Sequence, residues 1–110
     1  MSRATHRDID ESVFKALADP TRRGILDLLY VNERTTGDLV SAFPKLSRCT
    51  VMLHLGILEE AGLVIVRRDG RFRWNYLDVA PIQRIQERWI GKYAERAAAG
   101  LLALKRELEE

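Results

Sequence analysis

Cysteine, histidine and proline are scarce in this sequence, which has one cysteine, two histidines and three prolines in 110 residues. Because Cys49 cannot form a disulfide within the chain, we expect a cytoplasmic protein rather than a secreted, disulfide-linked one. No apolar run approaches the ~18 residues of a membrane-spanning helix, and the polar residues 1–10 do not resemble a secretory signal. Signatures of a nucleophile elbow, a phosphate-binding glycine loop and paired catalytic carboxylates are also missing, so we do not expect an enzyme.

The sequence does have the composition of an ordinary globular protein, with 46% apolar and 31% charged residues. Its length fits a single domain, which we expect to cover residues 1–110. The net charge is only +2, but residues 44–77 hold six basic residues against three acidic ones. Such a basic segment suits a polyanionic partner, although a solvated charged face would explain it equally well. The six basic residues are Lys45, Arg48, Arg67, Arg68, Arg71 and Arg73.

Helical periodicity and capping residues predict two helices at the start of the chain. In residues 10–18, three apolar side chains fall on one helical face: Val13, Phe14 and Leu17. Asp19 can then cap a second helix by accepting a backbone hydrogen bond. Pro20 suits the first position of that helix, because a helix leaves the amide there without a partner. We expect the second helix to run to about Tyr30.

Two further helices are predicted on either side of a tight break at residues 44–45. Thr36, which follows a polar turn, is the expected cap of a short helix through about Phe43. Ser47 is the expected cap of the next helix, which ends at Gly62, a residue suited to the left-handed conformation that terminates many helices. Two helices joined by such a turn form a helix-turn-helix.

The next stretch changes to the alternating pattern of strands around Asp69-Gly70, a dipeptide typical of two-residue hairpin loops. With these residues as the loop, Arg68 lies opposite Arg71, and Ile65 lies opposite Trp74. Alternation places an apolar set on one face, which we expect to pack on the core: Leu63, Ile65, Phe72, Trp74 and Tyr76. The other face, which we expect to be cationic and exposed, holds Arg68, Arg71 and Arg73.

A last helix is predicted from Pro81 to about Glu109, roughly 40 Å long at ~1.5 Å per residue. Its apolar side chains recur every three or four residues and cover more surface than the rest of the chain can bury. We therefore expect residues 81–110 to be a dimerisation helix, which pairs with its symmetry mate and with the first helix. The alternative is a helix folded wholly onto its own domain. The expected dimer contacts are Ile9, Val13, Ile82, Ile85, Trp89, Tyr93, Leu101 and Leu104.

This order of elements predicts a mainly α fold with a small β-hairpin, namely a winged helix-turn-helix with the hairpin as its wing. An α-helix fits the major groove of duplex DNA, and a cationic hairpin beside it can reach the backbone or the minor groove. We therefore expect double-stranded DNA as a partner. The candidate DNA contacts are Thr36, Lys45, Ser47, Arg48, Thr50, Met52, Leu53, His54, Arg68, Arg71 and Arg73. For His54, a structural bond to a neighbouring turn is the alternative.

Three stretches of the sequence resemble the ArsR-type family of winged helix-turn-helix regulators. They are residues 14–26 (FKALADPTRRGIL), residues 47–64 (SRCTVMLHLGILEEAGLV), and residues 67–71 (RRDGR) with Trp74 and Tyr76. The resemblance covers roughly residues 9–80, and the three motifs occur in the order of the family. It implies a homodimeric repressor that binds an inverted-repeat operator.

The sequence departs from the metal sensors of that family. Those sensors carry a Cys-x-Cys pair in the third helix, or Asp, His and Glu ligands on the last helix. Here residues 36–43 contain no cysteine, and the last helix contains neither histidine nor cysteine. Because thiolate and imidazole are the groups that hold soft and borderline ions, we expect the metal-independent branch of the family, with no metal and no cofactor.

The predicted recognition helix is a second departure. At 100° per residue from a core-facing Val51, with Leu55 and Leu58 beside it, the outward face is apolar. It contains Cys49, Met52, Leu53 and Gly56. Hydrogen bonds to bases then fall mainly to Arg48 and Thr50, with His54 as a third candidate, while Met52 or Leu53 contacts thymine methyl groups.

Two other functions remain open. The apolar face of Met52, Leu53 and Gly56 would suit a protein-protein interaction module, although the basic wing argues against it. Cys49 lies in the first turn of a helix beside Arg48, where the helix dipole and a cation favour a thiolate. A thiol-responsive repressor that switches through Cys49 is therefore a second alternative. The operator, the target genes and any small-molecule effector are unknown.

Overall fold

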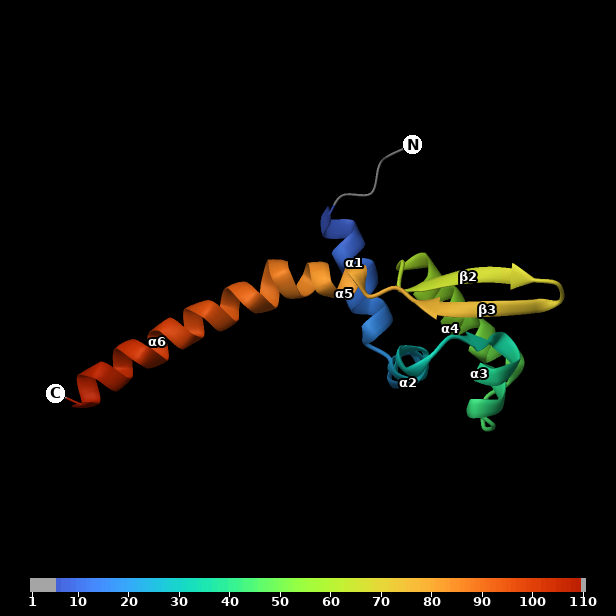
Figure 1. Cartoon of the computed structure of the whole chain (residues 1–110), viewed down its shortest axis with the longest axis horizontal. Helices are drawn as coiled ribbons and strands as arrows, with labels where there is room; N and C mark the ends of the chain where they lie inside the picture. The colour runs from blue at the N-terminus through green and yellow to red at the C-terminus, as the bar shows by residue number, and fades with distance from the viewer. Residues whose placement is uncertain (1–5, 110) are drawn as a thin grey trace.

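The computed structural model describes residues 6–109 and confirms a mainly helical fold with a small antiparallel sheet and a long C-terminal helix (Figure 1). Within that range the first helices are α1 (His6–Leu17), α2 (Pro20–Val31), α3 (Thr36–Ala42) and α4 (Arg48–Glu60). The strands are β1 (Arg34–Thr35), β2 (Val64–Asp69) and β3 (Phe72–Leu77). The chain continues through α5 (Ala80–Ile85), the π-helical turn η1 (Gln86–Ile90) and α6 (Gly91–Glu109).

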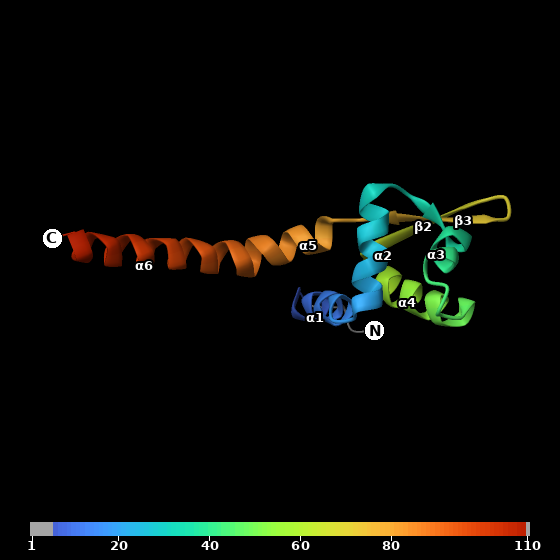
Figure 2. The same cartoon turned by 90° about the horizontal axis from the view of Figure 1, so that it is seen from below.

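The last three helical segments run on without a break and form one long rod, called the arm below (residues 80–109). Figures 1 and 2 show the arm projecting from the body (residues 6–79), on the side opposite the wing formed by β2 and β3. The radius of gyration is 18.7 Å, where a compact chain of this length gives about 13 Å. No described residue after Ile85 is buried, so the alternative of a last helix folded wholly onto its own domain is wrong.

The hydrophobic core lies where α1, α2 and α4 pack against one another and against the sheet. As predicted, α4 faces this core with Val51, Leu55 and Leu58, which are fully buried. Val13 of α1 and Ile85 of α5 belong to the same cluster, with exposures of 0% and 5%. Their prediction as dimer contacts is therefore wrong, because both side chains are already covered within one protomer.

Three predicted helix ends are confirmed. Asp19 caps α2 by accepting a hydrogen bond from the Arg22 amide (3.0 Å), and the Ser47 hydroxyl caps α4 by accepting one from the Thr50 amide (3.1 Å). Gly62 follows α4 with a φ of +79°. The amide of Gly62 and the next amide bond back to carbonyls in the last turn of α4, which is the arrangement in which glycine ends many helices.

The cap of α3 differs from the prediction by one residue. Thr35, not Thr36, is the cap, and it forms a reciprocal pair with Asp38. The Thr35 hydroxyl accepts from the Asp38 amide, and the Asp38 carboxylate accepts from the Thr35 amide, each at 3.1 Å. Thr36 is instead the first helical residue and is buried. Because a buried hydroxyl cannot reach DNA, the prediction of Thr36 as a DNA contact is wrong as well.

The sheet has three strands in the order β1-β3-β2, and both pairings are antiparallel. Strand β1 is missing from the sequence-based prediction, because it has only two residues and begins in the predicted polar turn at residues 32–34. The hairpin itself is confirmed, but its register differs by two residues, and Arg68 lies opposite Arg73 instead of Arg71. The loop is Gly70-Arg71 rather than Asp69-Gly70. Only Gly70 has a positive φ there, which suits a type II′ turn with glycine first.

The two faces of the wing are the reverse of the prediction. The side facing the body carries Val64, Val66, Asn75 and Leu77, of which Val64 and Asn75 are buried, and nearer the tip Arg68 and Arg73. The aromatic side faces outward: Ile65 and Phe72 are about half exposed, and Trp74 and Tyr76 are only partly covered. Leu63 is buried, as predicted. Because it precedes β2, its burial does not show which face of the strand is turned toward the core.

Candidate nucleic-acid interface

A tight turn at residues 43–47 joins α3 to α4 and completes the helix-turn-helix. The Leu46 amide donates to the Phe43 carbonyl at 3.0 Å, and both side chains pack against the core. These two apolar contacts fix the turn to the body. Lys45, between them, is exposed, so its ammonium group is accessible to a phosphate.

The first turn of α4 presents a cation beside two linked hydroxyl groups. The Ser47 and Thr50 hydroxyls lie 2.9 Å apart and share a hydrogen bond. Arg48 and Cys49 are both exposed on this turn. The amides at the start of a helix carry a partial positive charge, and the Arg48 guanidinium adds a full charge to it. This turn is therefore an electropositive point suited to an anion such as a DNA phosphate.

The outward face of α4 is apolar, as the sequence indicates. Leu53 is 64% exposed, and Gly56 is open enough that a Cβ added to it would meet nothing within 4 Å. Met52 is only partly exposed, because it packs against the core cluster. Of the two side chains predicted to contact thymine methyl groups, Leu53 is thus the more accessible.

His54 turns away from this face toward the junction of α1 and α2. Its Nδ1 lies 3.2 Å from Arg22 Nη1 and 3.9 Å from a carboxylate oxygen of Asp19. Arg22 also donates to the carbonyls of Lys15 and Ala16. The Arg22 amide, more than the nearby charges, holds the pKa of Asp19 below its usual value of 3.8. The contacts of His54 are those of the structural alternative.

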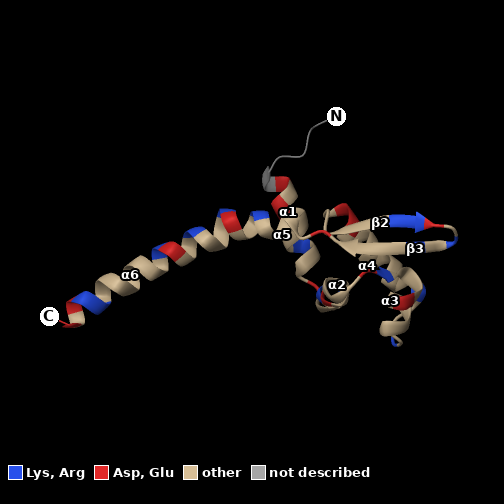
Figure 3. Ribbon diagram, in the orientation of Figure 1, with Lys and Arg blue, Asp and Glu red and all other residues tan. Residues whose placement is uncertain are grey.

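The wing carries its cations toward the tip, as Figure 3 shows. Arg68 and Arg71 are exposed, and the Arg71 guanidinium lies 5.5 Å from the centre of the Phe72 ring. Arg73 lies opposite Arg68 in the hairpin and donates to the Glu59 carboxylate of α4 at 2.9 Å. Arg73 therefore ties the wing to the recognition helix, whereas the other two arginines remain accessible.

Asn75 is a part of this region that the sequence did not point to. It is fully buried, and its amide nitrogen donates to the Thr36 hydroxyl at 3.1 Å and to the Arg34 carbonyl at 3.2 Å. A weaker contact of 3.4 Å reaches the carbonyl of Arg73. Asn75 thus connects the wing to β1 and to the start of α3. A polar residue at an inward-facing strand position is the signal that could have found it.

The fold gathers most of the predicted DNA contacts at one end of the body. Figures 1 and 2 show the wing, α3 and the start of α4 at the end opposite the arm. Exposed there are Lys45, Ser47, Arg48, Leu53, Arg68 and Arg71, with Thr50 partly exposed. Thr36 is buried, Met52 and His54 pack against the body, and Arg73 is held in an ion pair.

The described residues offer neither a metal site nor a membrane span. No group of three or more histidine, cysteine, aspartate or glutamate side chains in that part of the chain is arranged to hold a metal ion. No helix between residues 6 and 109 combines the length and the apolar character needed to cross a membrane.

Known proteins with similar sequences and structures are regulators of transcription. A family model described as a helix-turn-helix domain matches residues 17–67. The transcriptional repressor SdpR of Bacillus subtilis is 40% identical over 72 residues, which are 66% of this chain and 79% of that protein.

Two solved structures extend the similarity to the fold. A crystal structure of an ArsR family transcriptional regulator superposes with a TM-score of 0.76 at 28% identity, covering 87% of this chain and 97% of that one. The solution structure of a homodimeric winged helix-turn-helix DNA-binding domain from Mycobacterium bovis, described as a possible ArsR-family regulator, has a TM-score of 0.63 at 30% identity. It covers 81% of this chain and 84% of that one. The chain therefore belongs to the ArsR-type family of winged helix-turn-helix transcriptional regulators.

Proposed function

We propose that this chain is a homodimeric, sequence-specific DNA-binding repressor that recognises an inverted-repeat operator. The observation that carries the proposal is the exposure of three arginines at one end of the body: Arg48 in the capped first turn of α4, and Arg68 and Arg71 near the wing tip. Within the described residues none of the three forms an ion pair. Uncompensated cations around a helix start are what a winged helix-turn-helix needs to bind duplex DNA.

In the proposed complex, α4 enters the major groove. Arg48 and Thr50 then reach phosphates or base edges, and Leu53 contacts thymine methyl groups. Lys45 and the two wing-tip arginines lie along the phosphate backbone, where they fix the register of the protein without reading sequence. Arg73 acts through its ion pair with Glu59, which holds the wing beside the recognition helix.

The second half of the proposal is that the arm, together with α1, pairs with a second copy of the chain. Its apolar side chains beyond Ile85 are exposed, including Trp89, Tyr93, Leu101 and Leu104. Solvent-exposed apolar residues along a helix of this length favour pairing with another helix. The homodimeric domain from Mycobacterium bovis supports the same arrangement. The proposed contacts are Ile9, Ile82, Trp89, Tyr93, Leu101 and Leu104.

The DNA-binding proposal is tested by selecting duplexes from a random pool and measuring affinity by gel shift at two salt concentrations. We expect binding that survives nonspecific competitor DNA and weakens steeply with salt. The double variant Arg68→Ala/Arg71→Ala should bind more weakly to all sequences. It should lower the salt slope by about 4 for the dimer, one for each phosphate that the two wings no longer neutralise. Lys105→Ala, which removes an exposed cation near the far end of the arm, is the control.

A failure of this experiment would favour the interaction module. If the wild type selects no sequence, or the wing variant binds DNA as well as the Lys105→Ala control, the regulator proposal is wrong. Repression itself is tested with a promoter that carries the selected site: we expect expression to fall when the protein is present.

Sedimentation tests the dimer independently of DNA. We expect a dimer at micromolar concentration and a monomer for Leu101→Asp/Leu104→Asp, because charges on both apolar positions oppose burial of the helix face. Glu107→Asp, which keeps the charge of an exposed arm residue, is the control. A wild-type monomer would refute the proposed homodimer.

A further inference from the structure

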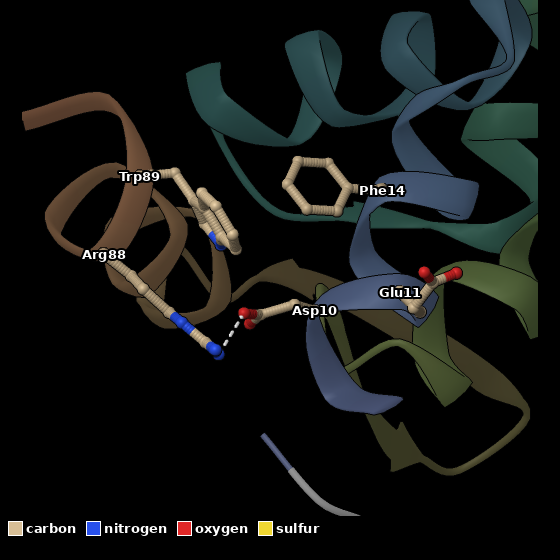
Figure 4. A pocket seen from close by; sticks show the side chains of 5 residues that line it. All are labelled: Asp10, Glu11, Phe14, Arg88 and Trp89. Carbon is tan, nitrogen blue, oxygen red and sulfur yellow. Dashed lines mark hydrogen bonds and ion pairs between the residues drawn. The ribbon is translucent and has the colours of Figure 1, made fainter. Parts of the chain in front are cut away.

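A buried carboxylate of the body, Asp10, contacts the arm near the point where the arm leaves the body. Asp10 of α1 is 5% exposed, and its Oδ2 accepts a hydrogen bond from Arg88 Nη1 at 2.8 Å (Figure 4). Its Oδ1 lies 4.0 Å from Nε of Arg84, one helical turn earlier. One carboxylate of the body thus faces two successive turns of the arm. We call these three residues the Asp10 cluster. Because a buried carboxylate without a cation is costly, the cluster resists displacement of the arm.

Two aromatic side chains stand beside the cluster. Phe14 of α1 and Trp89 of η1 face each other across a hollow of about 210 Å³, which Asp10 and Arg88 also line (Figure 4). Trp89 in turn stacks on Tyr93 of α6, with ring centroids 6.3 Å apart. The junction with the body therefore continues directly into the exposed apolar stripe of the arm.

The π-helical turn lies at this same junction and changes the direction of the stripe. Its signature is a hydrogen bond from the Gly91 amide to the Gln86 carbonyl, five residues earlier. The apolar stripe advances by steps of four residues from Ile85 to Leu101. On an uninterrupted α-helix, at ~100° per residue, these steps would rotate Leu101 about 160° away from Ile85. One extra residue in a π turn reduces the rotation to about 60°, which keeps the stripe nearer the side that packs on the body.

We propose that the Asp10 cluster and the π turn set the angle between body and arm, and with it the separation of the two recognition helices. The inference rests on the proposed homodimer and extends it, because it names the residues that select the spacing of the operator half-sites.

A small change in this angle is enough to alter the spacing. Recognition helices in such dimers lie ~34 Å apart, and therefore ~17 Å from the two-fold axis. With a lever of about this length, a rotation of ~10° moves each helix about 3 Å. Because both bodies rotate, the separation of the two helices can change by up to about 6 Å, which exceeds the ~3.4 Å rise of one base pair. If the angle between body and arm were no longer fixed, the dimer would discriminate less between operators that differ in half-site spacing. Each body would still recognise its own half-site.

Cys49 makes the separation measurable. It is the only cysteine in the sequence, it is exposed, and it lies in the first turn of α4. A spin label on Cys49 therefore gives one intermolecular distance per dimer by pulsed electron paramagnetic resonance. We expect a single narrow distribution for the wild type. For Asp10→Asn we expect a distribution about twofold wider, or a mean shifted by about 3 Å or more, because a neutral amide no longer holds two guanidinium groups.

Asp27→Asn, the same change at an exposed aspartate of α2, is the matched control. Arg88→Gln is a second test in case Asp10→Asn fails to fold, since the Arg88 side chain is 46% exposed; it should also broaden the distribution. The π turn is tested with Gly91→Ala, where an added Cβ would lie 3.3 Å from the Gln86 carbonyl oxygen. Gly100→Ala, with nothing within 4 Å, is its control.

The outcomes separate this inference from the proposed homodimer. Folded, dimeric Arg88→Gln and Gly91→Ala with wild-type distributions would overturn the inference and leave the homodimer standing. Equal broadening in Asp27→Asn would also overturn it, since removal of any carboxylate would then suffice. No intermolecular distance in the wild type at micromolar concentration would overturn the homodimer instead.

Discussion

Replacing Asn75 with alanine removes the polar connection beneath the wing. The Asn75 amide donates to Thr36 and to the Arg34 carbonyl from a fully buried position. Alanine leaves both acceptors without this donor and opens space around them. Asn32→Ala is the matched control, because Asn32 is exposed at the end of α2.

The magnitude follows from the two short hydrogen bonds. A buried polar group left unpaired costs about 1–3 kcal/mol, so two such groups lower the free energy of unfolding by about 2–6 kcal/mol. Because the Arg34 carbonyl is only partly buried, we expect a value towards the lower end of this range, about 3 kcal/mol. For a domain of this size, 1 kcal/mol shifts Tm by about 4–8 °C. We therefore expect Asn75→Ala to lower Tm by about 12–24 °C, whereas Asn32→Ala should change stability by less than about 0.5 kcal/mol.

Thermal unfolding followed by circular dichroism measures this difference, at one protein concentration because dimerisation makes Tm concentration-dependent. Operator affinity measured below the Tm should fall as well, since the wing and α3 lose their common anchor. The isosteric Asn75→Asp should be at least as damaging, because it points oxygen instead of N–H at the Arg34 carbonyl. Equal Tm values for Asn75→Ala and Asn32→Ala, or a tolerated Asn75→Asp, would refute the reasoning.

Three further predictions follow from the helix ends. The Asp19 cap contributes stability above its unfolded pKa and loses it as the pH falls through its lowered folded pKa; Tm should therefore drop more between about pH 5 and pH 3 in the wild type than in Asp19→Asn. Alkylation of exposed Cys49 with a maleimide should block operator binding in a gel shift, while Cys49→Ser is insensitive; unchanged binding by the alkylated wild type would argue against α4 as the reading helix. Gly62→Ala should destabilise the fold by about 1–2 kcal/mol because of its positive φ, whereas Gly56→Ala, inside α4, should stabilise it by up to about 1 kcal/mol in the same melting experiment.

The helices and the helix-turn-helix were predictable because their signals are local. Asp19 with Pro20, Ser47, and Gly62 each act within one turn of the chain, so residue type and spacing identify them. The apolar positions of α4 are equally local. The wing loop was harder: Asp69-Gly70 and Gly70-Arg71 both place a glycine in the turn, and only the backbone angles distinguish them.

The predictions that proved wrong concern contacts between elements that are distant in the sequence. The aromatic side chains of β3 were predicted to pack on the core, but Asn75 occupies the inward position instead. Its amide can be buried there because the Thr36 hydroxyl and the Arg34 carbonyl of β1 accept its hydrogen bonds. Val13 and Ile85 share a helical period with the exposed stripes around them, and only packing shows that one protomer covers both. The π turn did leave a trace in the sequence, since repeated four-residue steps drift on a regular helix.

The bare surface of α6 means that this segment has little to keep it folded in a lone chain. None of its residues is buried, and in proteins most of the stability of a helix comes from the packing of its apolar face rather than from intrinsic propensity. Folding of α6 and dimerisation would then be coupled. Dilution of the protein should therefore lower both its helical content, seen by circular dichroism, and the fraction of operator that is bound. The fraction of the protein that can bind its operator would then rise steeply with the concentration of the protein in the cell.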